Sequence, residues 1–343
     1  MKFQLAINLE RLDPTENMAD VARHTLEMVQ LADEYGFELA WAAEHHALEM
    51  TIAPNPFQLL TWWADHTDNI RLGSGVANAA YWHPINLAGE AAMLDLISGG
   101  RLELGLGSGA YQREFDRMKP GLEQKNSYRY MQEMLPLVRE LWNGDVEHKG
   151  EFWSFPQSTS CPKPLQKNVP FWVAARSPIT FDYAVNNDCN ILSWPLTKGM
   201  EEVELYMKRL ETAVHASDGN RRPKIAMMRH TAVFEKEEAA DYAINSVRRQ
   251  MSQFANLFQN LDEVRNGFAA ESDIDSLENR NDYTPETLRQ NLMFGKPEEV
   301  ISKLELYQDR GVDAFIYYAS MGLDMNFQKQ SLELFCKEVM PAL

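Results

Sequence analysis

A carboxylate and two adjacent histidines follow an apolar run in the segment WAAEHHALEM, where they stand as Glu44, His45 and His46. Imidazole titrates near neutral pH, so either histidine could carry a proton or bind a metal. If the run is a strand, neighbouring side chains point to opposite faces. His45 then shares a face with Trp41 and Ala43, while Glu44 and His46 face the other way. This divergence disfavours a metal site, because metal ligands must converge on one point.

Two further segments carry residues suited to binding an anion. The glycine-rich turn GLGSGAY, residues 105–111, lets the backbone approach a ligand closely and could offer N–H groups to it. In AARSPIT, residues 174–180, Arg176 supplies a cation and Ser177 a hydroxyl. Pro178 suits the first turn of a helix, whose free N–H groups attract phosphate. The alternative for this segment is a simple helix cap by Ser177 beside a surface arginine.

These segments lie at the ends of apolar runs that alternate with amphipathic ones. Helical spacing of apolar residues predicts helices over residues 18–35, 56–66, 84–97, 127–142, 179–186, 200–215 and 297–310. Short apolar runs predict strands within residues 2–9, 37–43, 69–77, 99–109, 169–177, 189–194, 224–234 and 312–320. Alternation of strands with helices requires parallel pairing, and eight units favour a closed (β/α)8 barrel over an open doubly wound sheet. The active site of such a barrel lies at the carboxyl ends of its strands.

We therefore expect one barrel domain, residues 1–343, with two excursions. Residues 144–170 are rich in aromatic residues and proline, and residues 256–294 include a long acidic stretch that is poor in apolar residues. Long excursions in a compact domain are usually functional lids or disordered links. Two interpretations of residues 256–294 are open at this point. The segment is either a lid or a solvated insertion without a catalytic role.

The composition describes a globular protein and disfavours some partners. Hydrophobic residues make up 45% of the chain and charged residues 24%, which is enough apolar material for a core. The formal net charge is −17, from 50 acidic and 33 basic residues, and no dense run of Lys and Arg interrupts it. Binding to nucleic acid or to an anionic membrane needs a basic surface, so neither partner is expected.

The cysteines and the hydropathy pattern indicate where the protein works. Cys161, Cys189 and Cys336 are well separated, which indicates buried, reduced thiols and neither a disulfide framework nor a zinc site. The N-terminal apolar run is too short for a signal peptide, and no stretch approaches about 20 uninterrupted apolar residues. We expect a cytoplasmic protein.

The sequence resembles the luciferase-like flavin-dependent monooxygenases, the relatives of bacterial luciferase. The matching phrases are AEHH after the second strand, HPINLAGEAAMLDLISGGRLELGLGSGAYQREF around the third helix and fourth strand, AARSPIT after the fifth strand, and ILSW at the sixth. The resemblance covers most of residues 1–235 and continues weakly to the last strand. It implies a (β/α)8 barrel that binds reduced FMN from a separate flavin reductase, forms a flavin C4a-hydroperoxide with O2, and thereby oxygenates an organic substrate.

The resemblance also assigns roles to single residues. In the family the first histidine of the EHH-type phrase faces the flavin and is catalytic, which makes His45 the proton carrier and leaves His46 structural. Asn78 is expected to join His45 in catalysis. The flavin phosphate is expected on Arg176, Ser177 and Thr180 with the backbone of Ala175, and the isoalloxazine ring near Ala77, Asn78, Gly107, Ser108, Tyr111 and Trp194.

One implied feature and one departure concern the third and fourth strands. The family often has a non-proline cis peptide after the third strand, which we expect around Val76 to Asn78. Bacterial luciferase carries a reactive cysteine and an arginine after the fourth strand, where this sequence has Gly107 and Ser108. The phosphate charge is thus left chiefly to Arg176, and substrate handling is expected to differ from that in luciferase.

The substrate is less sharply defined. An aromatic-lined pocket for a small apolar molecule is predicted from residues near the site segments, namely Trp41, Trp62, Trp63, Tyr81, Trp82 and Tyr111. Two alternatives are open: an F420-dependent oxidoreductase that transfers hydride on the same barrel, and a non-catalytic flavin-binding paralogue. The resemblance also implies a homodimer that packs through helices near the second and third units.

Overall fold

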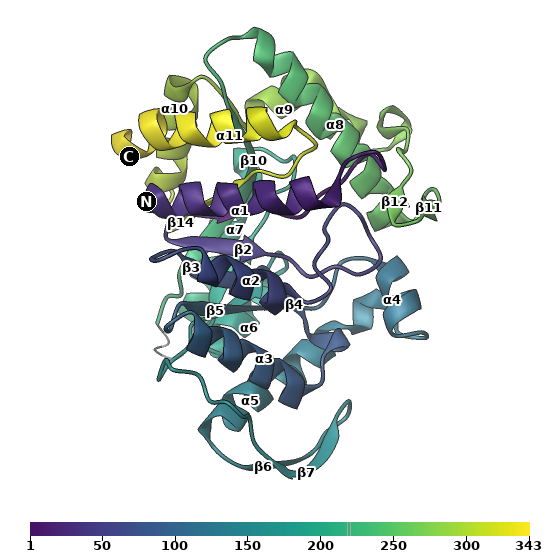
Figure 1. The fold of residues 1–343 in the computed structure, drawn as a ribbon, viewed down its shortest axis with the longest axis vertical. Coiled ribbons are helices and arrows are strands. Elements are labelled where there is room, and N and C mark those ends of the chain that lie inside the picture. The colour runs from purple at the N-terminus through teal and green to yellow at the C-terminus, as the bar shows by residue number, and fades with distance from the viewer. Residues whose placement is uncertain (218, 220) are drawn as a thin grey trace.

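A computed structural model describes residues 1–217, 219 and 221–343, and its architecture is a closed parallel barrel surrounded by helices (Figure 1). The barrel strands are β1 (Lys2–Ala6), β2 (Leu39–Ala42), β3 (Arg71–Ser74), β5 (Leu102–Gly107), β8 (Phe171–Ala174), β9 (Asn190–Ser193), β10 (Ile225–Val233) and β14 (Ala314–Tyr318). Neighbours pair in the order β10-β14-β1-β2-β3-β5-β8-β9, and a β9–β10 pairing closes the circle. The predicted (β/α)8 barrel is confirmed.

The helices lie outside the strands. They are α1 (Met18–Glu34), α2 (Pro56–Asp65), α3 (Pro84–Ile97), α4 (Gln112–Met118), α5 (Tyr128–Asn143), α6 (Pro178–Asn186), α7 (Met200–Ala216), α8 (Glu238–Gln259), α9 (Pro285–Asn291), α10 (Pro297–Asp309) and α11 (Met325–Leu334). Local chemistry fixes several of their ends. The side chain of Asn17 accepts a hydrogen bond from the N–H of Ala19 at the start of α1, and Gly36, with φ of 79°, follows its end.

Short strands complete the fold outside the barrel circle. β4 (Ala77–Asn78) pairs with β5, and β13 (Met293–Gly295) pairs with the far end of β10. Two antiparallel hairpins, β6–β7 (Val146–Lys149 with Ser154–Ser158) and β11–β12 (Val264–Arg265 with Phe268–Ala269), stand apart. In Figure 1 the β11–β12 hairpin and α4 lie on the side opposite the two chain termini.

Two tryptophans fill the barrel interior. The rings of Trp41 and Trp172 meet edge to face with centroids 5.4 Å apart, and the indole of Trp41 donates to Gln4 at 2.9 Å. Trp41 lies directly against β3, where a Cβ on Gly73 would stand 2.3 Å from its ring. Glycine is therefore required at position 73, and the packed tryptophans leave space for a ligand only toward the strand ends beyond them.

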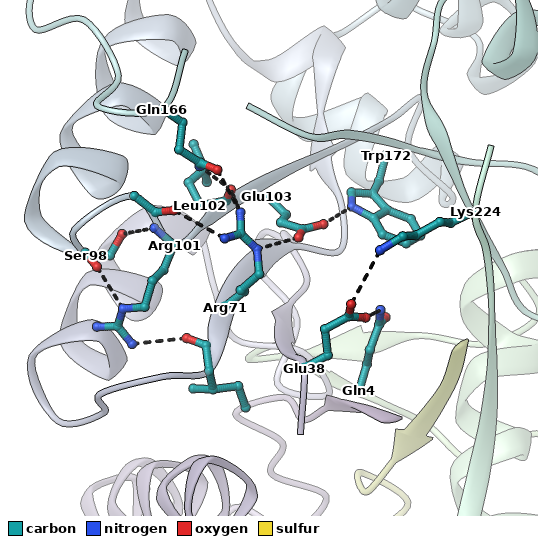
Figure 2. Close-up of polar contacts among 12 residues, drawn as sticks. Gln4, Glu38, Arg71, Ser98, Arg101, Leu102, Glu103, Gln166, Trp172 and Lys224 are labelled. Carbon is teal, nitrogen blue, oxygen red and sulfur yellow. Dashed lines mark hydrogen bonds and ion pairs between the residues drawn. The ribbon is translucent and has the colours of Figure 1, made fainter. Parts of the chain in front are cut away.

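A polar network holds the opposite end of the barrel together (Figure 2). Arg71 on β3 contacts the carboxylate of Glu103 on β5 at 2.5 Å and donates to Gln166 at 2.9 Å. The indole of Trp172 donates to the other oxygen of Glu103. Burial raises the pKa of Glu103, and Arg71 and Trp172 oppose that shift by stabilising the charged form. Because this network lies away from the carboxyl strand ends, we assign it to stability.

The structure corrects several boundaries. β2 ends at Ala42, before the predicted end at residue 43, so His45 is not part of it and makes only an isolated bridge to Ala53. The excursion predicted at residues 256–294 begins inside α8 and ends with β13, so both of its ends belong to regular elements. Of the three cysteines, Cys161 is exposed, contrary to expectation. Within the described residues, no helix is long and apolar enough to cross a membrane.

We predict that Arg71→Ala lowers the free energy of unfolding by about 3 kcal/mol, because it leaves the buried Glu103 carboxylate without its cation. Protonation of Glu103 relieves that cost, so the loss should be larger at pH 8 than at pH 5. Denaturant titration at both pH values measures it. As a matched control, Lys125→Ala removes an exposed ion pair with Glu123 and should change stability by less than about 1 kcal/mol. Equal effects of the two variants would contradict the assignment.

Candidate active site

A cavity of about 650 Å³ opens at the carboxyl ends of the strands, and each of the eight barrel strands or the loop after it contributes to its wall. Its lining includes ten of the eleven residues that the sequence singled out: His45, Asn78, Gly107, Ser108, Tyr111, Ala175, Arg176, Ser177, Thr180 and Trp194. Ala77 is the exception. It is fully buried on β4 and packs in the core between barrel and helices.

His45 is held in one orientation by a carboxylate. Its Nδ1 lies 2.9 Å from Oε2 of Glu114, and its ring stacks on Tyr111 with centroids 4.9 Å apart. Because an ionised carboxylate only accepts hydrogen bonds, Nδ1 carries the proton, and Nε2 is the acceptor in the neutral ring. Burial lowers the pKa of His45, but the charge of Glu114 and its hydrogen bond outweigh that effect and raise the pKa overall.

Glu114 was missed by the sequence analysis. It lies in the first turn of α4 and is 2% exposed, and its second oxygen accepts a hydrogen bond from the N–H of His46 at 2.6 Å. One carboxylate therefore holds both the ring of His45 and the backbone beside it. The signal was present in the phrase GAYQREF, residues 109–115, where a lone acidic residue follows the glycine-rich turn at the start of a short helix.

His46 does not line the cavity and belongs to a different network, which reaches the cavity wall through Glu44 and Asn78. Its Nε2 lies 2.7 Å from one carboxylate oxygen of Glu44. The other oxygen accepts hydrogen bonds from the N–H of Asn78 at 2.7 Å and from the indole of Trp82 at 2.8 Å. Glu44 thus fixes β4 beside the cavity, and the ring of His46 holds the Glu44 carboxylate in place, which agrees with a structural role. In the described part of the chain, no three potential ligand side chains gather as a metal site requires.

The backbone beside this network has the expected unusual geometry. The non-proline cis peptide is Gly75–Val76, directly after β3 and at the start of the expected segment. The main chain then passes Asn78, whose side-chain amide donates to the carbonyl of Glu44 at 3.1 Å. This donation leaves the side-chain oxygen of Asn78 available at the cavity wall.

The opposite part of the wall is the N-terminus of α6. Ser177 caps the helix and Thr180 completes a capping box, with the Thr180 hydroxyl accepting from the N–H groups of Arg176 and Ser177 at 3.2 Å each. Nε of Arg176 contacts the Tyr206 hydroxyl at 3.2 Å. A second guanidinium, that of Arg209, donates to the carbonyl of Arg176. This end of the cavity therefore has one lining cation, Arg176, beside a helix N-terminus, and both features suit an anion.

The aromatic lining differs from the predicted one. Trp41 and Tyr111 line the cavity, but the other four aromatic residues proposed for it, Trp62, Trp63, Tyr81 and Trp82, do not. Trp63 is fully buried in the core on α2, because the inward face of α2 packs against the outside of the barrel. The aromatic wall instead includes Trp194, Phe254, Phe258 and Tyr318. Phe254 and Phe258 come from α8, which the sequence analysis did not predict.

Comparison with known proteins places this geometry in a family. The model of the luciferase-like monooxygenases matches residues 1–314. The oxygenase component of a flavin-dependent trigonelline monooxygenase from Acinetobacter baylyi is 41% identical over 343 residues, which is 100% of this chain and 95% of that protein.

Solved structures share the fold at lower identity. The monooxygenase RslO1 from Streptomyces bottropensis superposes with a TM-score of 0.81 at 23% identity, covering 99% of each chain. The oxygenating constituent of 3,6-diketocamphane monooxygenase from Pseudomonas putida, solved in complex with FMN, gives 0.78 at 19% identity over 99% of this chain and 98% of that one. The chain belongs to the luciferase-like monooxygenase family, and its predicted enzyme class, a flavin-dependent monooxygenase, is confirmed.

Proposed function

We propose that this chain is the oxygenase of a two-component system: it takes reduced FMN from a separate flavin reductase and inserts one atom of O2 into a small organic substrate. The observation that carries the proposal is the single cavity that joins an oriented imidazole to an anion-binding helix terminus. Bound reduced flavin supplies the two electrons that reduce the second oxygen atom to water.

The residues present fit FMN. The cavity volume lies in the range of sites for ligands of this size. Arg176 and the α6 terminus match a phosphate in charge and in hydrogen-bond donors. Gly107 brings the backbone of β5 close to the cavity, and a Cβ there would stand 2.4 Å from Val76, so the wall cannot be thickened at this point. Cavity walls of this kind suit a flat ring system anchored by its phosphate.

His45 is placed to move a proton at Nε2. Glu114 fixes the tautomer at Nδ1 and holds the ring against Tyr111, so Nε2 can accept a proton from, or return one to, a group in the cavity. Asn78 offers an amide oxygen on the same wall, and we assign it to orienting the reacting group. The aromatic rings in the cavity wall leave fewer polar contacts for water beside the reacting groups.

The trigonelline monooxygenase relative supplies the first substrate to test. Trigonelline is an N-methylated pyridine carboxylate, a flat ring that suits walls formed by Trp41, Trp194 and Tyr318. We thus narrow the expected small apolar substrate to a small planar molecule. The F420-dependent alternative predicts hydride transfer without O2, so anaerobic substrate turnover with reduced F420 would contradict the proposal.

We further propose that the protein is a cytoplasmic homodimer. Apolar side chains on α3 are exposed in the isolated chain: Met93 by 44%, Leu96 by 48% and Ile97 by 53%. They form part of one helix face in the second and third units, which is the region expected to pair.

We predict that His45→Ala retains FMN binding but lowers oxygenation by 10²- to 10⁴-fold, an order-of-magnitude range for loss of a proton-transfer group. Mass spectrometry of ¹⁸O incorporated from ¹⁸O₂ into the product measures it. The control His215→Ala removes an exposed histidine of α7 and should leave turnover unchanged. Wild-type turnover in His45→Ala would refute the assigned role.

We predict that Glu114→Gln lowers the pKa of His45. The substitution removes the charge that raises this pKa and leaves burial, which lowers it. NMR titration of the imidazole should show the midpoint moving to lower pH, and the pH profile of turnover should move in the same direction. Asp116→Asn, an exposed change on the same helix, should leave the midpoint in place. An unshifted midpoint in Glu114→Gln would show that the carboxylate does not control the imidazole.

We predict that Arg176→Ala weakens binding of reduced FMN by about 10- to 100-fold, which corresponds to about 1.5–3 kcal/mol for one charge-assisted hydrogen bond. Anaerobic titration measures the affinity. Riboflavin, which has no phosphate, should bind the variant and the wild type equally, and Lys208→Ala, an exposed change on α7, should affect neither flavin. An equal loss for FMN and riboflavin would place the phosphate elsewhere.

A further inference from the structure

Five aromatic rings form a continuous wall of the cavity, which we call the aromatic belt: Tyr111, Phe258, Phe254, Trp194 and Tyr318. Each ring contacts the next. The centroids of Tyr111 and Phe258 are 4.9 Å apart, those of Phe258 and Phe254 6.1 Å, those of Phe254 and Trp194 5.8 Å, and those of Trp194 and Tyr318 5.5 Å. The belt comes from the loop before α4, from α8, from the segment after β9 and from β14, so the fold gathers it from four distant parts of the chain.

Among the described residues, no Lys or Arg side chain lies over a ring of the belt, and the ring of His45 stacks on Tyr111 alone. Within the described residues, the six Lys or Arg side chains found over aromatic rings all lie over other rings. Among the described lining residues, Arg176 is the sole Arg or Lys, and it lies at the phosphate end. Arg229 precedes His230 in the sequence, but its guanidinium is buried with Nε donating to Tyr307 at 2.7 Å. The rings of Phe258, Phe254, Trp194 and Tyr318 therefore have no Lys or Arg over their faces and are available to a cationic ligand.

The ionisable groups behind the belt are two carboxyl groups, a neutral histidine and the buried Arg229, which helps to lower the pKa of that histidine. After burial, which is the larger cause, the negative charge of Glu114 raises the pKa of Tyr111, and that of Glu10, whose own pKa burial raises to about 7, raises the pKa of Tyr318. His230 lies 4.7 Å from Tyr318 and 5.5 Å from Trp194 between ring centroids, and burial lowers its pKa to about 3, so it stays neutral. A bound flavin phosphate adds further negative charge to the same cavity. A positive ligand is thus favoured over a neutral one of equal shape.

A second observation points to a ligand at the belt. Nε1 of Trp194 is shielded from solvent and has no hydrogen-bond partner among the described residues. The Tyr318 oxygen accepts a hydrogen bond from the amide of Asn8 at 2.9 Å, so its own O–H is available to another acceptor. Two neutral donors beside aromatic faces suit a ring cation that also carries an acceptor substituent, such as a carboxylate.

We propose that the aromatic belt selects substrates by their positive charge, so that the oxygenase acts on N-alkylated heteroaromatic cations and discriminates against neutral rings of the same shape. This inference rests on the proposed function and adds to it the feature of the substrate that is recognised and the residues that recognise it. The charge is read by ring faces, and no carboxylate side chain needs to contact the cation directly.

The test compares ligands that differ only in charge. Trigonelline and 3-methylbenzoate have nearly the same shape, but the first has a ring nitrogen cation where the second has carbon. N-methylpyridinium and toluene form a second pair without the carboxylate. Each is titrated calorimetrically into protein loaded with reduced FMN under anaerobic conditions. We expect each cation to bind about tenfold or more tightly than its neutral-ring partner. Equal affinities within a pair, or no binding of either cation, would overturn the proposal.

Variants then assign the preference to the belt. Phe258→Leu keeps an apolar side chain but removes the ring's negative face, and because Phe258 is 43% exposed, folding should be unaffected. It should weaken trigonelline binding about threefold or more and change 3-methylbenzoate binding by less than about twofold. Phe254→Leu is the second variant. Phe152→Leu, on the β6–β7 turn, is the matched control outside the cavity. An equal loss for both ligands would show that the rings contribute only apolar contact.

Flavin binding measured on the same samples separates the two proposals. If reduced FMN does not bind, the proposed function fails. If FMN binds and a substrate is oxygenated, but charge has no effect on affinity, only the selection by the belt fails.

Discussion

Closure of the barrel is the constraint on which everything else in this molecule depends. The pairing of β9 with β10, at Ile191 with Ile225 and Ser193 with Met227, turns an open row of parallel strands into a ring. Once the ring is closed, all eight carboxyl strand ends meet at one rim. His45, Glu114 and Arg176 are far apart in the sequence. They come together because each follows the carboxyl end of a barrel strand, namely β2, β5 and β8.

The two ends of the barrel use buried charge in different ways. At the amino ends of the strands, Arg71 and Glu103 are paired with each other and with neighbouring polar side chains. Their charges therefore serve to stabilise the fold. At the carboxyl ends of the strands, Glu114 is paired with His45, for which we propose a catalytic role. A histidine held by a carboxylate keeps one nitrogen for the cavity, whereas an arginine held in the same way offers little chemistry. The pair that we assign to stability thus lies at one end of the barrel, and the pair that we propose for catalysis lies at the other.

Much of this could be predicted from the sequence, because helix spacing and apolar runs report directly on the barrel. The expected helix over residues 84–97 agrees with α3 at both ends, and a helix capped by Ser177 begins at Pro178 as expected. The residues that were missed have weaker local signals. α8 was not predicted although it is long, and its Phe254 and Phe258 are recognisable as cavity residues only after the chain folds back over the rim. Trp62 and Trp63 show the reverse error, since nearness in sequence to the site did not bring them to its inner face.

The central claim is that one flavin spans the cavity from the N-terminus of α6 to the imidazole of His45. A crystal structure of the protein in complex with FMN tests it most directly. We expect electron density for the phosphate within hydrogen-bond distance of Ser177 and Arg176, and for the isoalloxazine ring beside His45 and Asn78. A flavin whose phosphate binds elsewhere, or whose ring lies away from His45, would contradict it.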